Sequence, residues 1–387
     1  MEKIIFKRVL HPVGQGAFFS EQFFDDQGNS IFNVAYDCGT LSPQKHLQIE
    51  IENTFNLTDK VEAIDVLFIS HLDKDHISGL DYLVRLKCLT DKSVVVLPLN
   101  YPLVLKMVLQ GISANGGQLT DGVDAALLSL FESGAKILGI NNNEEFVPGD
   151  NAISMDEELP VMREFSQLNS METLRYRNLW FYLPFNTILD DNRYKQFLDK
   201  LAEEEIDRAQ LTDIIYVQKN LPKLKEIYQN LTKGINGVTS INVNSLNLLS
   251  YCSRGGVVDR HSMINYYSWW RFYHRWQSDK DSRCSCLYTG DCVMEKHFER
   301  CLDLLARSLK IQIGMLQIPH HGRQSCYNMV IADREDILSG FTNFDSTDKK
   351  NKFVKQIVHD FSVSERLFFQ ITEDYHSRLE MYEHIEA

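Results

Sequence analysis

The sequence predicts an α/β fold, built as a layered sandwich in which sheets are covered by helices. Two observations predict it: the N-terminal part has the pattern of a β-meander, and apolar runs of strand length then alternate with segments of helical spacing. The 387 residues, 44% hydrophobic and 24% charged, have the composition of a globular protein. This length suits either one large domain or two smaller ones.

The meander comes first in the chain. We expect its strands over residues 4–9, 17–24 and 30–37. The tight turn Gly14-Gln15-Gly16 separates the first two strands, and a polar turn at residues 25–29 separates the last two. These elements begin an all-β layer.

Strands alternate with helices from residue 66 onward. The apolar run Val66–Ser70 has the length of a buried strand and ends at His71, and apolar residues take helical spacing from Ile77. Further strands are expected over residues 94–97 and 135–140, and further helices over 102–110 and 121–133. Such alternation is typical of a sheet covered by helices.

Residues 150–235 are predicted to be a helical insertion. Residues 156–164 and 190–231 are rich in Glu, Lys, Asp and Leu at helical spacing, and they include three consecutive glutamates at 203–205. One interpretation of these charges is a solvated helix face. The other is a surface that binds a protein partner.

Strand patterns resume over residues 244–251, 286–289, 315–319 and 367–371. An aromatic-rich flap, residues 254–283, lies between the first two of these strands. Its Trp269, Trp270, Arg271 and Arg275 are of the types that stack on bases and contact phosphates. Aromatic insertions also pack on a core or cover a site as a lid, so the flap has these alternative roles.

Composition excludes several classes of function. A formal net charge of −13 argues against nonspecific wrapping of nucleic acid. The sequence has no apolar stretch long enough for a signal peptide or a membrane span, so we expect a cytoplasmic protein without membrane contact. The 8 cysteines are too dilute for a disulfide scaffold, and we expect Cys284 and Cys286, which alternate along a strand, to pack in the core.

Residues 71–76 carry the clearest chemical signal. His71, Asp73, Asp75 and His76 directly follow a buried strand and precede a helix, so that one loop can turn all four toward one point. Two imidazoles and two carboxylates suit a divalent metal ion. For this segment alone, a solvated polar loop is the alternative.

Two later strands end in further residues of ligand type. Asp291 follows the strand at 286–289 behind Gly290, and His320 and His321 follow the strand at 315–319. Strand ends gather at one edge of a layered α/β protein. These side chains can therefore share a site with residues 71–76.

Together these motifs resemble the metallo-β-lactamase fold superfamily, whose central signature is H-x-H-x-D-H. The chain is most similar to the branch typified by the hydrolase domain of the ComEC-type competence protein, a DNA-uptake channel. That branch has Asp in place of the second His, as residues 71–76 do. Its V-G-Q-G turn, N-x-x-S-L strand, T-G-D and H-H-G also follow in the same order here, at residues 13–16, 242–246, 289–291 and 320–322.

The resemblance implies that residues 1–387 form a four-layer αββα sandwich with one or two divalent ions, Zn or Mn, at the sheet edge. One ion would lie at His71 and Asp73, the other at Asp75 and His76, and Asp291 would bridge them. The full implied set of metal ligands is His71, Asp73, Asp75, His76, Asp291 and His320.

The resemblance also implies roles other than metal binding. Asp37 would orient a ligand from behind, or else be an ordinary turn residue. Asp75 and His321 are the candidate catalytic residues, His321 as a proton donor or substrate contact, although it could also be a simple neighbour of the ligand. Ala17 stands where the competence branch has Asp, which leaves the role of that position open.

The chain departs from the superfamily at the first metal. Most members supply another histidine between the signature and the bridging Asp, but no histidine lies between His76 and His261. His261 or His274 could reach in from the flap, or a water, carboxylate or carbonyl could fill the position, or the ion binds weakly. The carboxylates at 73, 75 and 291 also favour a harder ion such as Mn²⁺.

The leading functional hypothesis is a metal-dependent phosphodiesterase or nuclease that acts through a metal-bound hydroxide. Its substrate would be a phosphodiester, either nucleic acid or a nucleotide. One alternative is a module whose hydrolase site is gated by, or silent without, a protein partner bound through residues 150–235. The other is an acyl or lactam hydrolase, which the missing middle histidine makes less favoured.

Overall fold

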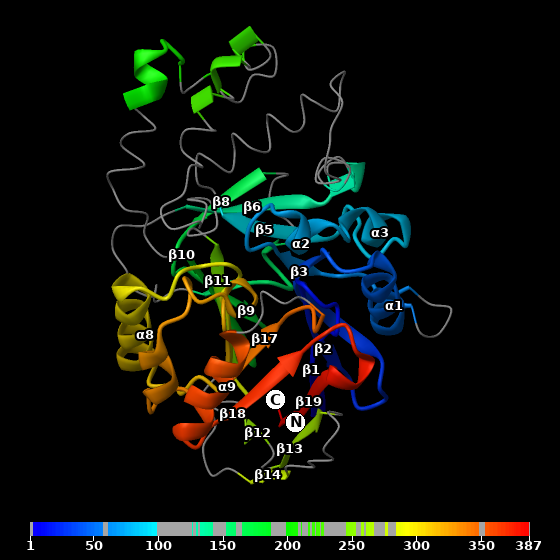
Figure 1. The fold of residues 1–387 in the computed structure, drawn as a ribbon. Helices are drawn as coiled ribbons and strands as arrows, with labels where there is room; N and C mark the ends of the chain where they lie inside the picture. Colours follow the sequence, from blue (N-terminus) through cyan, green and yellow to red (C-terminus); the bar gives the residue numbers. More distant parts are fainter. Residues whose placement is uncertain are drawn as a thin grey trace.

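The computed structural model describes residues 3–56, 61–98, 126, 129–130, 132–141, 152–159, 165–186, 199–207, 210, 216, 219–220, 222–224, 226–227, 245–252, 257–258, 261–266, 275–277, 284–347 and 353–386. These residues form two β-sheets that face each other, with helices on their outer sides (Figure 1). The principal helices are α1 (Gln44–Phe55), α2 (Lys74–Ile77), α3 (Leu80–Arg85), α8 (Lys296–Leu309) and α9 (Val354–Val363).

The first sheet contains the predicted meander. Its strands are β1 (Lys3–Leu10), β2 (Gly16–Phe24), β3 (Ser30–Thr40), β4 (Val66–Phe68), β5 (Val94–Pro98), β6 (Lys136–Asn141), β8 (Phe165–Asn169), β12 (Val257–Val258), β13 (His261–Tyr266), β14 (Arg275–Gln277) and β19 (Leu379–Glu386). β1, β2 and β3 pair antiparallel, and β4, β5, β6 and β8 continue the sheet in parallel. β19 pairs with β1 and thereby brings the C-terminal segment beside the N-terminal one.

The second sheet completes the sandwich. Its strands are β7 (Ala152–Ser154), β9 (Thr173–Tyr176), β10 (Trp180–Asn186), β11 (Leu246–Cys252), β15 (Cys286–Tyr288), β16 (Met315–Gln317), β17 (Ser339–Asn343) and β18 (Leu367–Ile371). β15, β16, β17 and β18 run parallel in this order, so their carboxyl ends lie at one edge. Two of the loops expected to carry ligands, after β15 and β16, leave from that edge.

Three groups of buried apolar side chains separate the layers. Between the sheets, Phe19 of β2 stacks on Tyr288 of β15 with ring centroids 5.3 Å apart. Leu47 of α1 packs on the outer face of the first sheet. Phe298 of α8 and Phe361 of α9 pack on the outer face of the second sheet. The α/β fold class and the four-layer αββα arrangement are therefore confirmed.

A buried ion pair joins the two sheets. Arg8 and Glu21 face each other across β1 and β2, and the Arg8 Nε–H donates to Glu21 Oε1 at 2.8 Å. From the second sheet, the hydroxyls of Tyr182, Tyr288 and Ser250 donate to the same carboxylate at 2.8, 2.8 and 2.7 Å. Because one carboxylate accepts from strands of both sheets, it fixes how the sheets lie on one another.

The prediction of a helical insertion over residues 150–235 is wrong for its first part. Residues 152–186 contribute strands β7, β8, β9 and β10, and residues 156–159 form turns. Both faces of β10 are buried, with Tyr182 between the sheets and Leu183 under the outer helices, so its sequence is a continuous apolar run without strand alternation. In the second part, residues 199–203 are helical, and most of the rest lies outside the described residues.

The flap at residues 254–283 supplies an edge of the first sheet where it is described. β13 pairs with β19, and β14 pairs with β13, with Arg275 opposite Met263. Trp269, Trp270 and Arg271 lie outside the described residues, as do the helix predicted over 102–110 and most of that over 121–133.

Two expectations from composition concern cysteines and membrane spans. All of the cysteines are free and buried, and Cys284 and Cys286 pack in the core between the sheets, as predicted. None of the helices in the described part of the chain is long and apolar enough to cross a membrane.

Candidate metal centre

The loop after β4 holds the first group of ligand-type side chains. β4 ends at Phe68, and the chain passes through His71 and Asp73 into the short helix α2, which carries Asp75 and His76. Gly39 of β3 allows this approach, because a Cβ there would lie 2.5 Å from the backbone of Asp75 and His76. The helix therefore packs directly on β3.

The second sheet brings its ligand-type residues to the same place. Gly290 has φ +55, and a Cβ on it would lie 2.6 Å from the Cβ of Ser70, so only glycine lets the loops after β4 and β15 meet. Asp291 follows immediately. His320 and His321, after β16, both take positive φ, and the His320 N–H donates to the Gly290 carbonyl at 3.1 Å.

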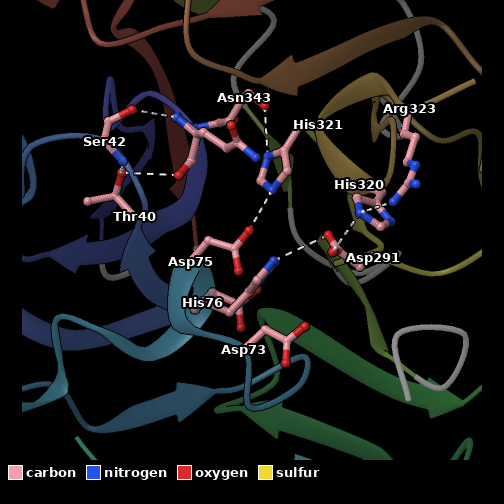
Figure 2. Close-up of polar contacts among 12 residues, drawn as sticks. Thr40, Ser42, Asp73, Asp75, His76, Asp291, His320, His321, Arg323 and Asn343 are labelled. Carbon is pink, nitrogen blue, oxygen red and sulfur yellow. Dashed lines mark hydrogen bonds and ion pairs between the residues drawn. The ribbon is translucent and has the colours of Figure 1, made fainter. Parts of the chain in front are cut away.

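Three imidazoles converge on Asp291, and Figure 2 shows two of them, His76 and His320, beside its carboxylate. Asp291 Oδ1 lies 3.2 Å from His76 Nε2, and its Oδ2 lies 3.7 Å from both His71 Nε2 and His320 Nε2. The Nε2 atoms of His71 and His76 are buried and make no hydrogen bond with the described residues. Such nitrogens, facing a buried carboxylate, fit the ligand atoms of a divalent cation.

Asp37 and Ser70 set the orientation of two of these rings. Asp37 accepts hydrogen bonds of 2.7 Å from His76 Nδ1, from the Ser70 N–H and from the Ser70 hydroxyl. Because that hydroxyl proton goes to Asp37, Ser70 Oγ accepts from His71 Nδ1 at 3.0 Å. These hydrogen bonds keep a proton on Nδ1 of each ring and hold the ring with its Nε2 toward Asp291.

His321 and Asp75 form a second pair beside the centre. His321 Nε2 lies 3.0 Å from Asp75 Oδ2, and its Nδ1 donates to the Asn343 carbonyl at 3.0 Å (Figure 2). Burial lowers the pKa of His321, but the hydrogen bond to Asp75 and the charge of Asp291 raise it above its ordinary value. The acceptor at each nitrogen favours the protonated form of His321. In its neutral form His321 offers a ligand atom instead, and the ligand atoms of Asp75, His76, Asp291 and His321 lie within 4.8 Å of one another.

The charges of the centre stabilise one another. Burial lowers the pKa of His76, but Asp37 and Asp291 raise it well above the ordinary value. Burial raises the pKa of Asp291, but the imidazoles around it hold it well below the usual range. The buried carboxylates of the centre thus stay ionised, and their negative charge suits a bound cation.

Each residue predicted for the metal centre itself has a definite place. His71, Asp73, Asp75, His76, Asp291, His320 and His321 lie together, with Asp37 behind them. Asp73 is the most exposed: its side chain is 34% accessible, and its Oδ2 lies 3.6 Å from His71 Nε2. Ala17 is buried opposite Gly39 in the β2 and β3 pair and brings no polar side chain.

Sequence reasoning did not assign a role to Ser70, Ser245, Arg323 or Cys326. Ser245, directly before β11, accepts from the Asp291 N–H at 3.0 Å, and its Oγ lies 3.3 Å from His71 Nδ1. It is the serine of the N-x-x-S-L motif. β13, which carries His261, is separated from β4 by β19, β1, β2 and β3, and His274 lies outside the described residues.

Comparison with known proteins finds similarity to solved structures alone. No family model matches the chain, and no curated protein matches it. Among solved structures, it is similar to the metallo-beta-lactamase fold protein YhfI from Bacillus subtilis, with 8% identity, a TM-score of 0.38, and 95% of this chain and 98% of that one covered. The chain is also similar to unliganded yeast PDE1, with 10% identity, a TM-score of 0.34, and 97% of this chain and 99% of that one covered. The function therefore has to be derived from the site itself.

Proposed function

We propose that this chain is a metal-dependent phosphodiesterase of the metallo-β-lactamase type, related to the competence branch. The observation that carries the proposal is the convergence of three imidazole Nε2 atoms on buried Asp291 at 3.2 to 3.7 Å. His71, Asp73, Asp75, His76, Asp291 and His320 are the proposed ligands of one or two ions, Zn or Mn. Bound ions would lower the pKa of a water molecule and neutralise charge on phosphoryl oxygens.

The side chains around the ions have separate tasks in this proposal. Asp291, between the three rings, holds them at one point and supplies negative charge that retains cations. Asp37 and Ser70 keep His76 and His71 in the tautomers that present Nε2. These residues position the reaction rather than take part in it.

His321 is the proposed proton donor. Its Nε2–H points at Asp75, and its Nδ1–H is anchored on the Asn343 carbonyl, which fixes the ring. A protonated imidazole held in this way can pass the Nε2 proton to the alkoxide that leaves a phosphodiester. The bond from Nδ1–H to the Asn343 carbonyl would then hold the neutral ring in place, and the negative charge of Asp75 would favour reprotonation of Nε2.

Two other predictions stay as proposals. A protein partner would bind through residues 150–235, of which β7 to β10 also belong to the sandwich. The flap residues Trp269, Trp270, Arg271 and Arg275 would contact a nucleic-acid substrate.

The proposal is tested by hydrolysis of bis(p-nitrophenyl) phosphate. Metal-stripped protein is resupplied separately with Mn²⁺ and Zn²⁺, and Asp75→Ala and Asp291→Ala are measured beside it. We expect turnover that requires metal and is lost in both variants. Hydrolysis of nitrocefin in place of the phosphodiester would show the acyl or lactam alternative, and silence toward both would refute a self-sufficient hydrolase.

A further inference from the structure

The imidazole of His320 has a thiol behind it. Cys326 Sγ lies 3.4 Å from His320 Nδ1, whereas His320 Nε2 lies 3.7 Å from Asp291 Oδ2. The sulfur therefore contacts the ring nitrogen other than the one that faces Asp291. Cys326 is buried, with 1% of its surface exposed. Any effect of its thiol on a bound ion would pass through the ring of His320.

The contact of His320 with Arg323 indicates which ring nitrogen carries the proton. Arg323 Nη1 lies 3.3 Å from His320 Nε2, and Figure 2 shows the guanidinium reaching this ring. A guanidinium can only donate a hydrogen bond, so Nε2 is the acceptor and has no proton. A neutral imidazole with a lone pair on Nε2 carries its proton on Nδ1. Nδ1 therefore donates to Cys326 Sγ.

The backbone fixes Cys326 in this place from two sides. Its N–H donates to the Arg323 carbonyl at 3.0 Å, which closes the turn after His320. Its carbonyl accepts from the Met294 N–H at 3.0 Å, and Met294 lies three residues after Asp291. The sulfur is thus held relative to both loops of the second sheet that supply ligand-type residues.

The other two imidazoles of the centre have the same arrangement. Ser70 Oγ accepts from His71 Nδ1 at 3.0 Å, and Asp37 accepts from His76 Nδ1 at 2.7 Å. An acceptor at Nδ1 fixes the tautomer and the direction of the ring, and it makes Nε2 a stronger metal ligand. A thiol is a weaker acceptor than a hydroxyl or a carboxylate, but it is placed at the equivalent atom of the third ring.

We propose that Cys326 is a positioning residue of the metal centre, whose sulfur accepts from His320 Nδ1 and thereby presents His320 Nε2 to a metal ion. A bound ion would replace the Arg323 donor at Nε2 and leave the hydrogen bond at Nδ1 unchanged. This inference rests on the proposed function, because it takes His320 as a metal ligand.

The tautomer of His320 is measured by long-range proton–nitrogen NMR of the metal-stripped full chain, labelled at histidine. The loss of one signal in His320→Gln assigns the ring. We expect the proton on Nδ1 in the native chain, and a larger population with the proton on Nε2 in Cys326→Ala, because the acceptor at Nδ1 is then absent. A native ring protonated on Nε2, or an unchanged tautomer in Cys326→Ala, would overturn the inference.

Metal affinity tests the consequence, by competition of Zn²⁺ and of Mn²⁺ with a chromogenic chelator. Cys326→Ala should lower the affinity about tenfold. Cys326→Ser should restore most of it, because a hydroxyl also accepts from Nδ1. Cys301→Ala is the matched control and should bind metal as the native chain does, since Cys301 is a buried cysteine of α8 in the outer core. Native affinity in Cys326→Ala, or an equal loss in Cys326→Ser or in Cys301→Ala, would contradict the role of Cys326 as an acceptor.

These measurements separate the inference from the proposed function. Metal binding that is unaffected by Cys326→Ala would refute the inference alone. Metal binding that responds to Cys326→Ala, without hydrolysis of bis(p-nitrophenyl) phosphate, would support the role of Cys326 and refute the proposed reaction. A native chain that binds neither ion would refute both.

Discussion

At the scale of single residues, the centre depends on hydrogen bonds made behind the imidazoles. Asp37 accepts from His76 Nδ1, and Ser70 Oγ accepts from His71 Nδ1, so each ring presents Nε2 to Asp291. Spacing and residue type pointed to the histidines and aspartates, because these are the side chains that commonly bind metals. Ser70, Ser245 and Cys326 were missed because a hydroxyl or thiol gains its role only from the neighbours that the fold supplies.

Asp37→Ala tests the orientation of His76. The loss of the acceptor on His76 Nδ1 should lower metal affinity about 10-fold to 100-fold, because the ring is no longer held with Nε2 toward Asp291. Competition with a chromogenic chelator measures this affinity. Asp26→Ala, at an exposed turn position of β2 and β3, is the control and should bind metal as the native chain does. Native affinity in Asp37→Ala would show that Asp37 has no orienting role.

At the scale of elements, strands and helices are positioned by buried polar groups that the apolar pattern does not reveal. Most strands were predicted from their apolar runs. Helix α1 was missed because Glu50 and Thr54 interrupt its buried face, where Leu47 and Ile51 also lie. Glu50 is buried because it pairs with His11 and Arg378, partners that come from distant parts of the chain.

The Arg8 and Glu21 pair should behave as a coupled unit. Glu21→Gln leaves a buried guanidinium without its counter-charge, and we expect it to lower the free energy of unfolding by about 3 to 5 kcal/mol. Arg8→Met combined with Glu21→Leu should cost less than the two single changes together, because neither charge is then left alone. Urea denaturation measures Glu21→Gln, the two single changes Arg8→Met and Glu21→Leu, and the double variant. Additive costs would contradict the coupling.

His11 should make stability depend on pH. It lies between Glu50 and Ser20, and burial lowers its pKa from 6.5 to about 4, so the folded chain keeps it neutral. The unfolded chain binds a proton on His11 at higher pH than the folded chain does. The stability that neutral His11 contributes is therefore present above about pH 6.5 and is lost as pH falls toward 4. The expected loss between about pH 7 and pH 5 is about 2 kcal/mol.

Urea denaturation of the native chain and of His11→Gln at both pH values isolates this contribution, since other groups titrate in both proteins. The difference in unfolding free energy between the two proteins should shrink as pH falls. A difference that is the same at both pH values would show that His11 is protonated in the fold as readily as in the unfolded chain.

At the scale of the whole molecule, the site exists because the ends of β4, β15 and β16 meet at one edge of the sandwich. Alternating strands and helices predicted a layered α/β fold, and the order of the motifs predicted that their side chains share a site. The pairing of the two sheets was not predictable, because it depends on contacts such as that of Glu21 with Tyr182 across the core. Among the strands at residues 152–186, β7, β8 and β9 were missed because they are short, at 3 to 5 residues, and β10 was missed because it is an apolar run with no distinctive period.

The central claim is that the cluster around Asp291 is a centre for divalent metal ions. The most direct measurement is a calorimetric titration of the metal-stripped full chain with Mn²⁺ and with Zn²⁺, repeated on Asp291→Asn. We expect one or two ions to bind the native chain, with protons released as His76 gives up its Nε2 proton, and binding to be weakened at least about tenfold in the variant. Equal binding by Asp291→Asn, or no binding of either ion by the native chain, would contradict the account.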